Sequence, residues 1–143
     1  GEEVRMRLHV ISDGTGSPPI VFIHGLGSTA ATWALCMAQL RDRHHVLAID
    51  LLGHGESPVP DDPAEYTRDR ALADIDEVLA RLTEPPVLAG DSLGGCLALA
   101  HAATRPGAAR GCRSSHNGYN RSRETPHDRP PGSPHRYSPG LTV

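Results

Sequence analysis

The stretch at residues 87–95, VLAGDSLGG, constrains this chain more than any other part of it. A short apolar run leads into Gly-x-Ser-x-Gly, and small apolar residues with helical character follow at 96–100. This order predicts a strand, a sharp turn with Ser92 at its tip, and a helix. The segments on either side of such a turn pass so closely that side chains at Gly90 and Gly94 would collide. The two glycines therefore support the strand–turn–helix interpretation.

Two more strand–helix units precede this turn. The apolar runs at 20–23 (IVFI) and 45–49 (HVLAI) each predict a strand buried on both faces of a parallel sheet. Helices are predicted over 30–40 and 68–82, where apolar residues recur at helical spacing. Strands that alternate with helices are typical of a parallel α/β sheet with right-handed crossovers. The sequence thus predicts an α/β fold.

The expected ends of these elements follow from local residue types. Alternating apolar and polar residues over 4–10 predict a strand with one buried face, and the Gly-, Ser- and Pro-rich residues 12–19 predict a turn. Ser28 or Thr29 is the expected cap of the first helix, and Thr67 that of the second, because their hydroxyls can accept from free N–H groups.

Three motifs then stand in order along the chain: HGLG at 24–27, DLLGHGES at 50–57 and GDSLGG at 90–95. Together they resemble the N-terminal half of an α/β-hydrolase of the single-domain, esterase-like type. The resemblance covers residues 4–106. It implies a partial α/β-hydrolase fold, in which a mainly parallel sheet is flanked by helices.

This resemblance implies that Ser92 is a catalytic nucleophile at the tip of a nucleophile elbow. A neutral hydroxyl attacks poorly, so such a serine needs a base, usually a histidine that an acid orients. The resemblance also implies an oxyanion hole formed by the backbone N–H groups of Leu26 and Leu93. The implied reaction is hydrolysis of an ester, thioester, lactone or similar acyl bond in a small molecule, with no metal or cofactor.

The remaining polar motif residues are interpreted as structural. His24 ends a buried strand and fixes a loop, His54 shapes the turn after 45–49, and Asp50 closes that strand's end. Asp76 lies on the polar face of its helix, and Asp91 is solvated or locally hydrogen-bonded. In the family pattern the triad acid follows the serine, so neither Asp50 nor Asp76 is that acid. The residues expected to shape the motifs are His24, Gly25, Gly27, Asp50, Gly53, His54, Gly55, Gly90 and Gly94.

The serine motif admits other interpretations. Residues 90–93 also spell the signature of the GDSL esterases and lipases, but in that family it follows the first strand, near the N-terminus. Dehalogenase and epoxide-hydrolase relatives carry Asp at the tip of the elbow, where this chain has Ser92. A function of a different class stays open: a non-catalytic hydrolase-fold remnant or a ligand-binding module.

Composition narrows the possible partners and surroundings. A formal net charge of −3 over 143 residues gives no case for nucleic acid or an acidic membrane surface. The three cysteines lack metal-ligand spacing, and Cys36 and Cys96 are expected to be reduced core residues. The N-terminus lacks the signal-peptide pattern, and no apolar run approaches the roughly 20 residues of a membrane span. These features predict a cytoplasmic protein and leave its oligomeric state open.

The family pattern stops after Pro106. From residue 111 onward Pro, Arg, Ser, Gly and His dominate, and too little apolar surface remains to offset the entropy of ordering. The sequence therefore predicts a hydrolase-like domain over 1–110 and a disordered tail over 111–143. Because the change at 108–112 is abrupt, we hypothesise a shift of reading frame there; the alternative is a natural tail on a truncated paralogue.

A disordered tail has two expected consequences. Its histidines and acids could reach Ser92 without being held in catalytic geometry, so the activity is expected to be impaired. The strand before Ser92 is expected to have an unpaired edge, which favours poor solubility and aggregation. The tail residues concerned are His116, Glu124, His127, Asp128 and His135.

Overall fold

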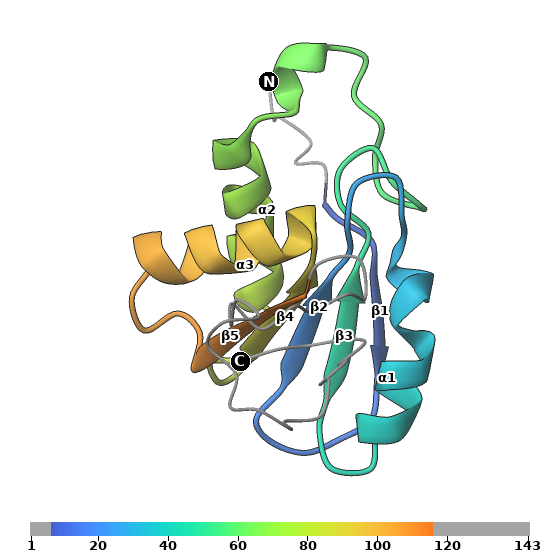
Figure 1. Ribbon diagram of the computed structural model, residues 1–143, viewed down its shortest axis with the longest axis vertical. Helices are drawn as coiled ribbons and strands as arrows, with labels where there is room; N and C mark the ends of the chain where they lie inside the picture. Colours follow the sequence, from blue (N-terminus) through green and yellow to red (C-terminus); the bar gives the residue numbers. More distant parts are fainter. Residues whose placement is uncertain (1–6, 116–143) are drawn as a thin grey trace, which may run out of the picture.

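A computed structural model of the chain describes residues 7–115 and contains one five-stranded sheet (Figure 1). The order across the sheet is β1-β3-β2-β4-β5, with β2, β3, β4 and β5 parallel and β1 antiparallel to β3. The α/β fold with a mainly parallel sheet is therefore confirmed. The strands are β1 (Val10–Asp13), β2 (Ile20–Ile23), β3 (Val46–Ile49), β4 (Val87–Asp91) and β5 (Gly111–Ser115).

The central strands are buried because their residues are apolar on both faces. In β2, Val21, Phe22 and Ile23 are all fully inaccessible to solvent. Phe22 lies opposite Ala48 of β3 and Ala89 of β4, so a large ring sits between two small side chains. A parallel strand of this kind is stable only where helices cover both faces of the sheet.

Helices supply that cover from both sides, and α1 lies across the sheet from α2 and α3 (Figure 1). On one face, α2 (Arg68–Leu79) and α3 (Leu93–Thr104) pack against Val21 and Ile23. On the other, a 3-10 turn (Ala30–Trp33) continues into α1 (Ala34–Leu40). There the ring of Trp33 stacks on Phe22, with 4.8 Å between ring centroids. Each layer thus has its own apolar core.

Of the two helix caps predicted from the sequence, only one forms the expected side-chain hydrogen bond. Thr67 caps α2, since its hydroxyl accepts a hydrogen bond from the backbone N–H of Arg70 at 3.1 Å. Thr29, one of the two residues predicted to cap the first helix, occupies the N-cap position, but the hydrogen bond expected from its hydroxyl is absent. The N–H of Ala30 is instead bonded to Asp50 Oδ1 at 2.8 Å. A buried carboxylate from the next motif therefore replaces the local hydroxyl.

The structure corrects the expectation that β4 has an unpaired edge. β5 pairs with β4 in parallel over its whole length, from Gly111 opposite Val87 to Ser115 opposite Asp91. The sequence does not predict this strand, because β5 has few apolar side chains. Its pairing depends instead on the backbone N–H and C=O groups that β4 would otherwise leave without hydrogen bonds. The predicted tail from residue 111 is thus wrong for its first five residues, and its remainder, residues 116–143, lies outside the described residues.

Two further expectations need correction. The predicted strand over 4–10 lies partly outside the described residues, and the observed β1 extends to Asp13, into the segment predicted as a turn. Cys96 is exposed rather than buried, because α3 presents Leu97 and Ala98, not Cys96, to the core. Cys36 is partly buried, and all three cysteines are free. In the part of the chain that the structure describes, no helix is both long and apolar enough to cross a membrane.

Candidate active site

The turn between β4 and α3 holds Ser92 in an unusual backbone conformation. Its φ is 54° and its ψ is −117°, and among residues 7–115 no other non-glycine residue has a positive φ. A serine in this region is strained and needs surrounding contacts to hold it. The backbone supplies two of them: Ser92 N–H donates to Ser115 O at 2.8 Å, and Cys96 N–H donates to Ser92 O at 3.0 Å.

The glycines beside the turn allow close backbone crossings. A Cβ on Gly90 would lie 2.2 Å from the carbonyl carbon of Gly94, and one on Gly94 would lie 2.0 Å from the carbonyl oxygen of Ile23. Both distances are far below van der Waals contact. The start of α3 therefore rests directly on the end of β2.

The loop after β2 lies beside Ser92. A Cβ on Gly25 would lie 3.3 Å from Ser92 Cβ and 3.9 Å from its hydroxyl oxygen. Gly27 has a φ of 77°, which turns the chain sharply after Leu26, and Leu26 is 80% exposed. The carboxyl ends of β2 and β4 thus bring together Ser92, Leu93 and the loop that contains Leu26.

His24 is fully buried and bonded through both ring nitrogens. Nε2 accepts from the backbone N–H of Leu51 at 2.9 Å. Nδ1 must then carry the proton of the neutral ring, and it donates to the carbonyl of Gly25 at 2.7 Å. Burial lowers the pKa of His24, because it disfavours the charged imidazolium more than the bond to Gly25 favours it. His24 joins the loop after β2 to the loop after β3.

The lowered pKa of His24 predicts a pH-dependent stability. Above its ordinary pKa of 6.5 the ring is neutral in both the folded and the unfolded states, so its full contribution is present. As pH falls below 6.5 the unfolded chain takes up the proton first, and the free energy of unfolding decreases. Urea unfolding at pH 7.5 and 5.5, followed by the fluorescence of the single tryptophan, measures this loss.

A histidine substitution separates this effect from that of the other histidines. His24→Gln should be less stable than the wild type at pH 7.5 and should lose less stability between pH 7.5 and 5.5. His45→Gln, at an exposed hydrogen bond to Ser12, is the matched control. If His24→Gln lost as much stability between pH 7.5 and 5.5 as the wild type, the pH dependence could not be attributed to His24.

Asp50, at the end of β3, is a buried hydrogen-bond acceptor for three segments. It accepts from the N–H of Ala30 at 2.8 Å, from the N–H of Glu56 at 3.1 Å, and contacts His9 Nδ1 at 2.9 Å. Burial alone would raise the pKa of Asp50, but the bonds from Ala30, Glu56 and His9 together hold it below its usual value. A Cβ on Gly55 would lie 2.3 Å from Asp50 Oδ1, so a residue with a side chain would clash with this carboxylate at position 55.

His54 connects the same loop to the Leu26 loop. Its Nε2 accepts from the N–H of Gly27 at 3.0 Å, and its Nδ1 lies 3.0 Å from the carbonyl of Leu52. Gly53 precedes it with a φ of 79°, where a Cβ would meet the ring of Tyr66 at 2.7 Å. The sequence alone does not predict the contact between His54 and Gly27, because the two residues are 27 positions apart and no local pattern connects them.

Asp91 and Asp76, the other two acids considered in the sequence, are bonded to side chains on neighbouring elements. The hydroxyl of Ser115 donates to Asp91 Oδ1 at 3.1 Å, across the β4–β5 pair. Asp76 joins α2 to α3, since its carboxylate contacts His101 Nε2 and Arg105 Nε, each at 2.7 Å. Buried His101 was not singled out in the sequence, where it stands among small helical residues.

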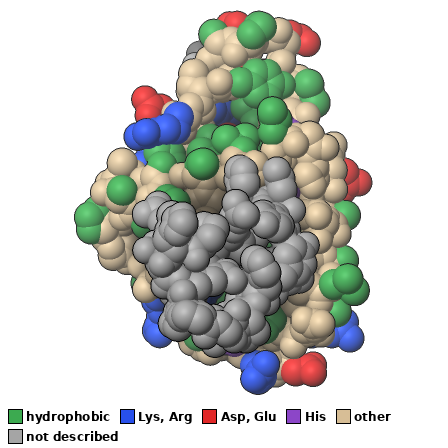
Figure 2. Space-filling view, viewed as in Figure 1, with side chains coloured by type: hydrophobic (Ala, Val, Ile, Leu, Met, Phe, Trp, Pro, Cys, Tyr) green, Lys and Arg blue, Asp and Glu red, His purple; other side chains and the backbone are tan. Residues whose placement is uncertain are grey.

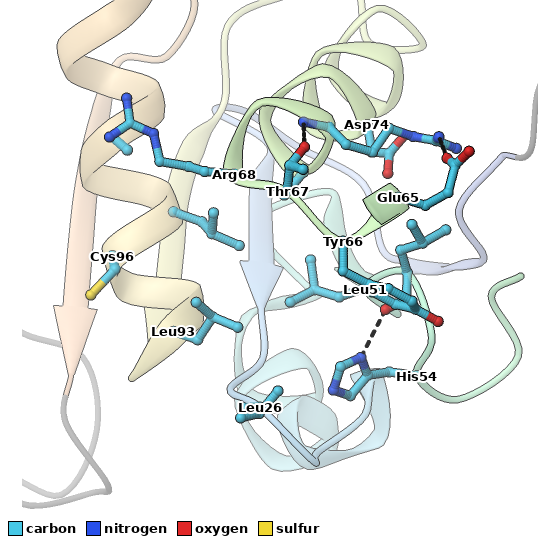
Figure 3. Close-up of a pocket in the computed structure, with 15 residues that line it drawn as sticks. Leu26, Leu51, His54, Glu65, Tyr66, Thr67, Arg68, Asp74, Leu93 and Cys96 are labelled. Carbon is cyan, nitrogen blue, oxygen red and sulfur yellow. Dashed lines mark hydrogen bonds and ion pairs between the residues drawn. The ribbon is translucent and has the colours of Figure 1, made fainter. Parts of the chain in front are cut away.

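A cavity of about 490 Å³ opens beside this site. Leu26 and Leu93 line one end of it, near His54, and the start of α2 lines the other (Figure 3). In the space-filling view, hydrophobic side chains gather around the segment that leads into α2 (Figure 2). The lining residues are Leu26, Leu51, Leu52, His54, Glu65, Tyr66, Thr67, Arg68, Arg70, Ala71, Asp74, Leu93, Cys96, Leu97 and Ala100.

No base for Ser92 is found within residues 7–115: none of their side chains is hydrogen-bonded to its hydroxyl. His24 and His54 have both ring nitrogens engaged by backbone groups. The five tail residues considered as a base or acid lie outside the described residues. Over the same described range, no three His, Cys, Asp or Glu side chains are grouped as metal ligands.

Known hydrolases are similar to this chain in sequence. The chain is 32% identical to epoxide hydrolase 4 of Mus musculus over 65% of this chain and 26% of that protein. It is 37% identical to the pimeloyl-[acyl-carrier protein] methyl ester esterase of Xylella fastidiosa over 62% of this chain and 32% of the esterase. The matched segments thus span about a quarter to a third of these curated relatives.

Solved structures agree with the fold. The monoacylglycerol lipase of Paleococcus ferrophilus superposes with a TM-score of 0.70 and 31% identity, over 85% of this chain and 47% of the lipase. A model of the α/β hydrolase family matches residues 20–139. That match includes the three motifs, β2 to β5 and the Ser92 turn. The chain therefore belongs to the α/β-hydrolase family.

Proposed function

We propose that Ser92 is the nucleophile of a serine hydrolase that acts on an ester or related acyl bond. The observation that carries this proposal is the strained backbone of Ser92, with its φ of 54°, beside the loop that contains Leu26. A serine is kept in such a conformation only where surrounding contacts impose it, and strained residues of this kind cluster at active sites. Serine at this position favours acyl chemistry over epoxide opening, because the family resemblance implies an Asp at the tip of the turn in enzymes that open epoxides.

In the proposed reaction, Ser92 Oγ attacks the carbonyl carbon of the substrate while a base takes its proton. The carbonyl oxygen becomes negative and is stabilised by the backbone N–H groups of Leu26 and Leu93. Collapse of this intermediate breaks the bond to the alcohol, which leaves with a proton. Water then releases the acid from Ser92 by the same steps. One lost oxyanion donor typically lowers the rate by about 10²–10³.

Covalent labelling tests the proposed nucleophile. A fluorophosphonate should label the folded wild-type chain at Ser92, and Ser92→Ala should lose the label while keeping the circular dichroism spectrum. Ser12→Ala is the matched control, because Ser12 is an exposed serine on β1 at the far edge of the sheet, and it should label like the wild type. Peptide mapping by mass spectrometry locates the adduct.

Two results would count against Ser92 as nucleophile: undiminished labelling of Ser92→Ala, or a folded wild-type chain that takes no label. Turnover is a separate measurement. Without a positioned base, a serine hydrolase loses on the order of 10⁶ in turnover and keeps about 10³–10⁴ over water. Hydrolysis of p-nitrophenyl acetate by the wild type and by Ser92→Ala measures whether Ser92 turns over at the full rate of a serine hydrolase or at the rate expected without a positioned base.

A second candidate function is ligand binding without turnover. It is favoured by the lack of a side chain hydrogen-bonded to the Ser92 hydroxyl within residues 7–115, together with the cavity beside it. Such a module would bind acyl compounds with equal affinity in the wild type and in Ser92→Ala. Absence of label in a folded, ligand-binding wild type would support this function over hydrolysis.

A further inference from the structure

The cavity extends along one face of α3. Leu93, Cys96, Leu97 and Ala100 all line it, at spacings of three, four and seven residues from the first. Such positions lie on one face of a helix, and at 1.5 Å per residue they extend over about 10 Å. The cavity therefore offers an apolar path that starts at the Ser92 turn and follows α3 toward its C-terminal half.

Charged side chains stand at the far end of this path, and most of them neutralise one another. Arg70 bonds Glu65 at 2.6 Å and Asp74 at 3.0 Å. These bonds, that to Asp74 foremost, raise the pKa of Arg70. The two carboxylates thus already have a cationic partner within the wall of the cavity.

Arg68 is different. It is exposed, lines the cavity, and within the described part of the chain its side chain makes no hydrogen bond or ion pair. Figure 3 shows its guanidinium reaching toward α3, on the opposite side of Thr67 from Glu65 and Asp74. A cation without a partner at the end of an apolar cavity favours a ligand that carries an anion there, and a planar guanidinium fits a carboxylate in particular.

We propose that the cavity binds acyl esters whose acyl chain ends in a carboxylate, with the carboxylate at Arg68 and the ester at Leu26 and Leu93. The orientation rests on the proposed function, which places the scissile bond at Ser92. The binding does not, because the contact with Arg68 needs no reaction. The aliphatic part of the ligand lies along Leu93, Leu97 and Ala100, where burial of apolar surface supplies most of the affinity.

A matched pair of ligands tests this assignment. Monomethyl suberate and dimethyl suberate differ at one end only, where the first carries a carboxylate. An exposed ion pair contributes about 0.2–1 kcal/mol, so the ratio of the two dissociation constants should shift about 1.5- to fivefold between the wild type and Arg68→Gln. The monoester should lose affinity in Arg68→Gln, and the diester should not. Titration calorimetry at low ionic strength measures both constants.

Two further variants make the result decisive. Arg43→Gln removes another exposed arginine, one that does not line the cavity, and should keep the wild-type ratio. Ser92→Ala should also keep it, so that a failure of Ser92 as nucleophile is distinguished from a failure of Arg68 as the anion site. Equal ratios in the wild type and Arg68→Gln, or no binding of either ester to the wild type, would overturn the proposal.

Discussion

Replacing Gly94 by alanine is expected to abolish folding. The added Cβ would lie 2.0 Å from the carbonyl oxygen of Ile23 and 2.6 Å from that of His24. These oxygens belong to the end of a central strand and to the loop beside Ser92, so neither can move without breaking the sheet or the site. Overpacking in a core typically costs about 1–3 kcal/mol, and a backbone clash this severe exceeds that range. Circular dichroism and the fluorescence of buried Trp33 measure the loss.

Gly111 provides the matched control for this substitution. It lies in β5, its φ is not positive, and a Cβ there would meet nothing within 4 Å. Gly111→Ala should therefore unfold at a urea concentration close to that of the wild type. A cooperative wild-type-like transition in Gly94→Ala would show that α3 and β2 are not packed as described.

Replacing Asp50 by alanine is expected to lower the free energy of unfolding by about 3–5 kcal/mol. The variant leaves the N–H groups of Ala30 and Glu56 without their acceptor and removes the carboxylate partner of His9. A buried group that loses its partner costs about 1–3 kcal/mol, which applies in full to the N–H of Ala30, and the partly buried N–H of Glu56 and ring of His9 add to that loss. Urea unfolding at pH 7.5 measures the difference.

Two companion variants define the origin of this loss. Asp50→Asn keeps the shape and one acceptor oxygen, so it should be destabilised less than Asp50→Ala. Asp42→Ala removes an exposed carboxylate that has no hydrogen bond or ion pair with the rest of the described chain, and its stability should match the wild type. Equal stability of Asp50→Ala and Asp42→Ala would contradict the role of Asp50 as a shared acceptor.

The parts of the fold that the sequence predicts are those in which one strong local signal dominates. The run at 20–23 is apolar at every position, and it forms the central strand β2. Thr67 stands just before an amphipathic segment and caps α2. Gly90 and Gly94 are required by the shape of the Ser92 turn, which the motif itself specifies. In these cases neighbouring residues alone determine the structure.

The parts that it does not predict depend on contacts distant in sequence. β5 has few apolar residues and forms because β4 offers an unpaired backbone. The N–H of Ala30 is bonded to Asp50, 20 residues away in the sequence, rather than to the hydroxyl of the adjacent Thr29. The position of Arg68 in the cavity wall depends on how α2 packs beside α3, and no local pattern specifies that packing.

The hydrogen bond from Ser92 N–H to Ser115 O has a consequence for the order in which the site can form during folding. The segment that joins β4 to β5 contains the whole of α3, so the pairing of β5 with β4 is a non-local contact. Non-local contacts carry the entropic cost of closing a loop, which the hydrogen bonds within α3 do not. Until β5 pairs, the backbone of Ser92 lacks the acceptor at Ser115, and the geometry of the serine is therefore complete only when β5 has joined the sheet.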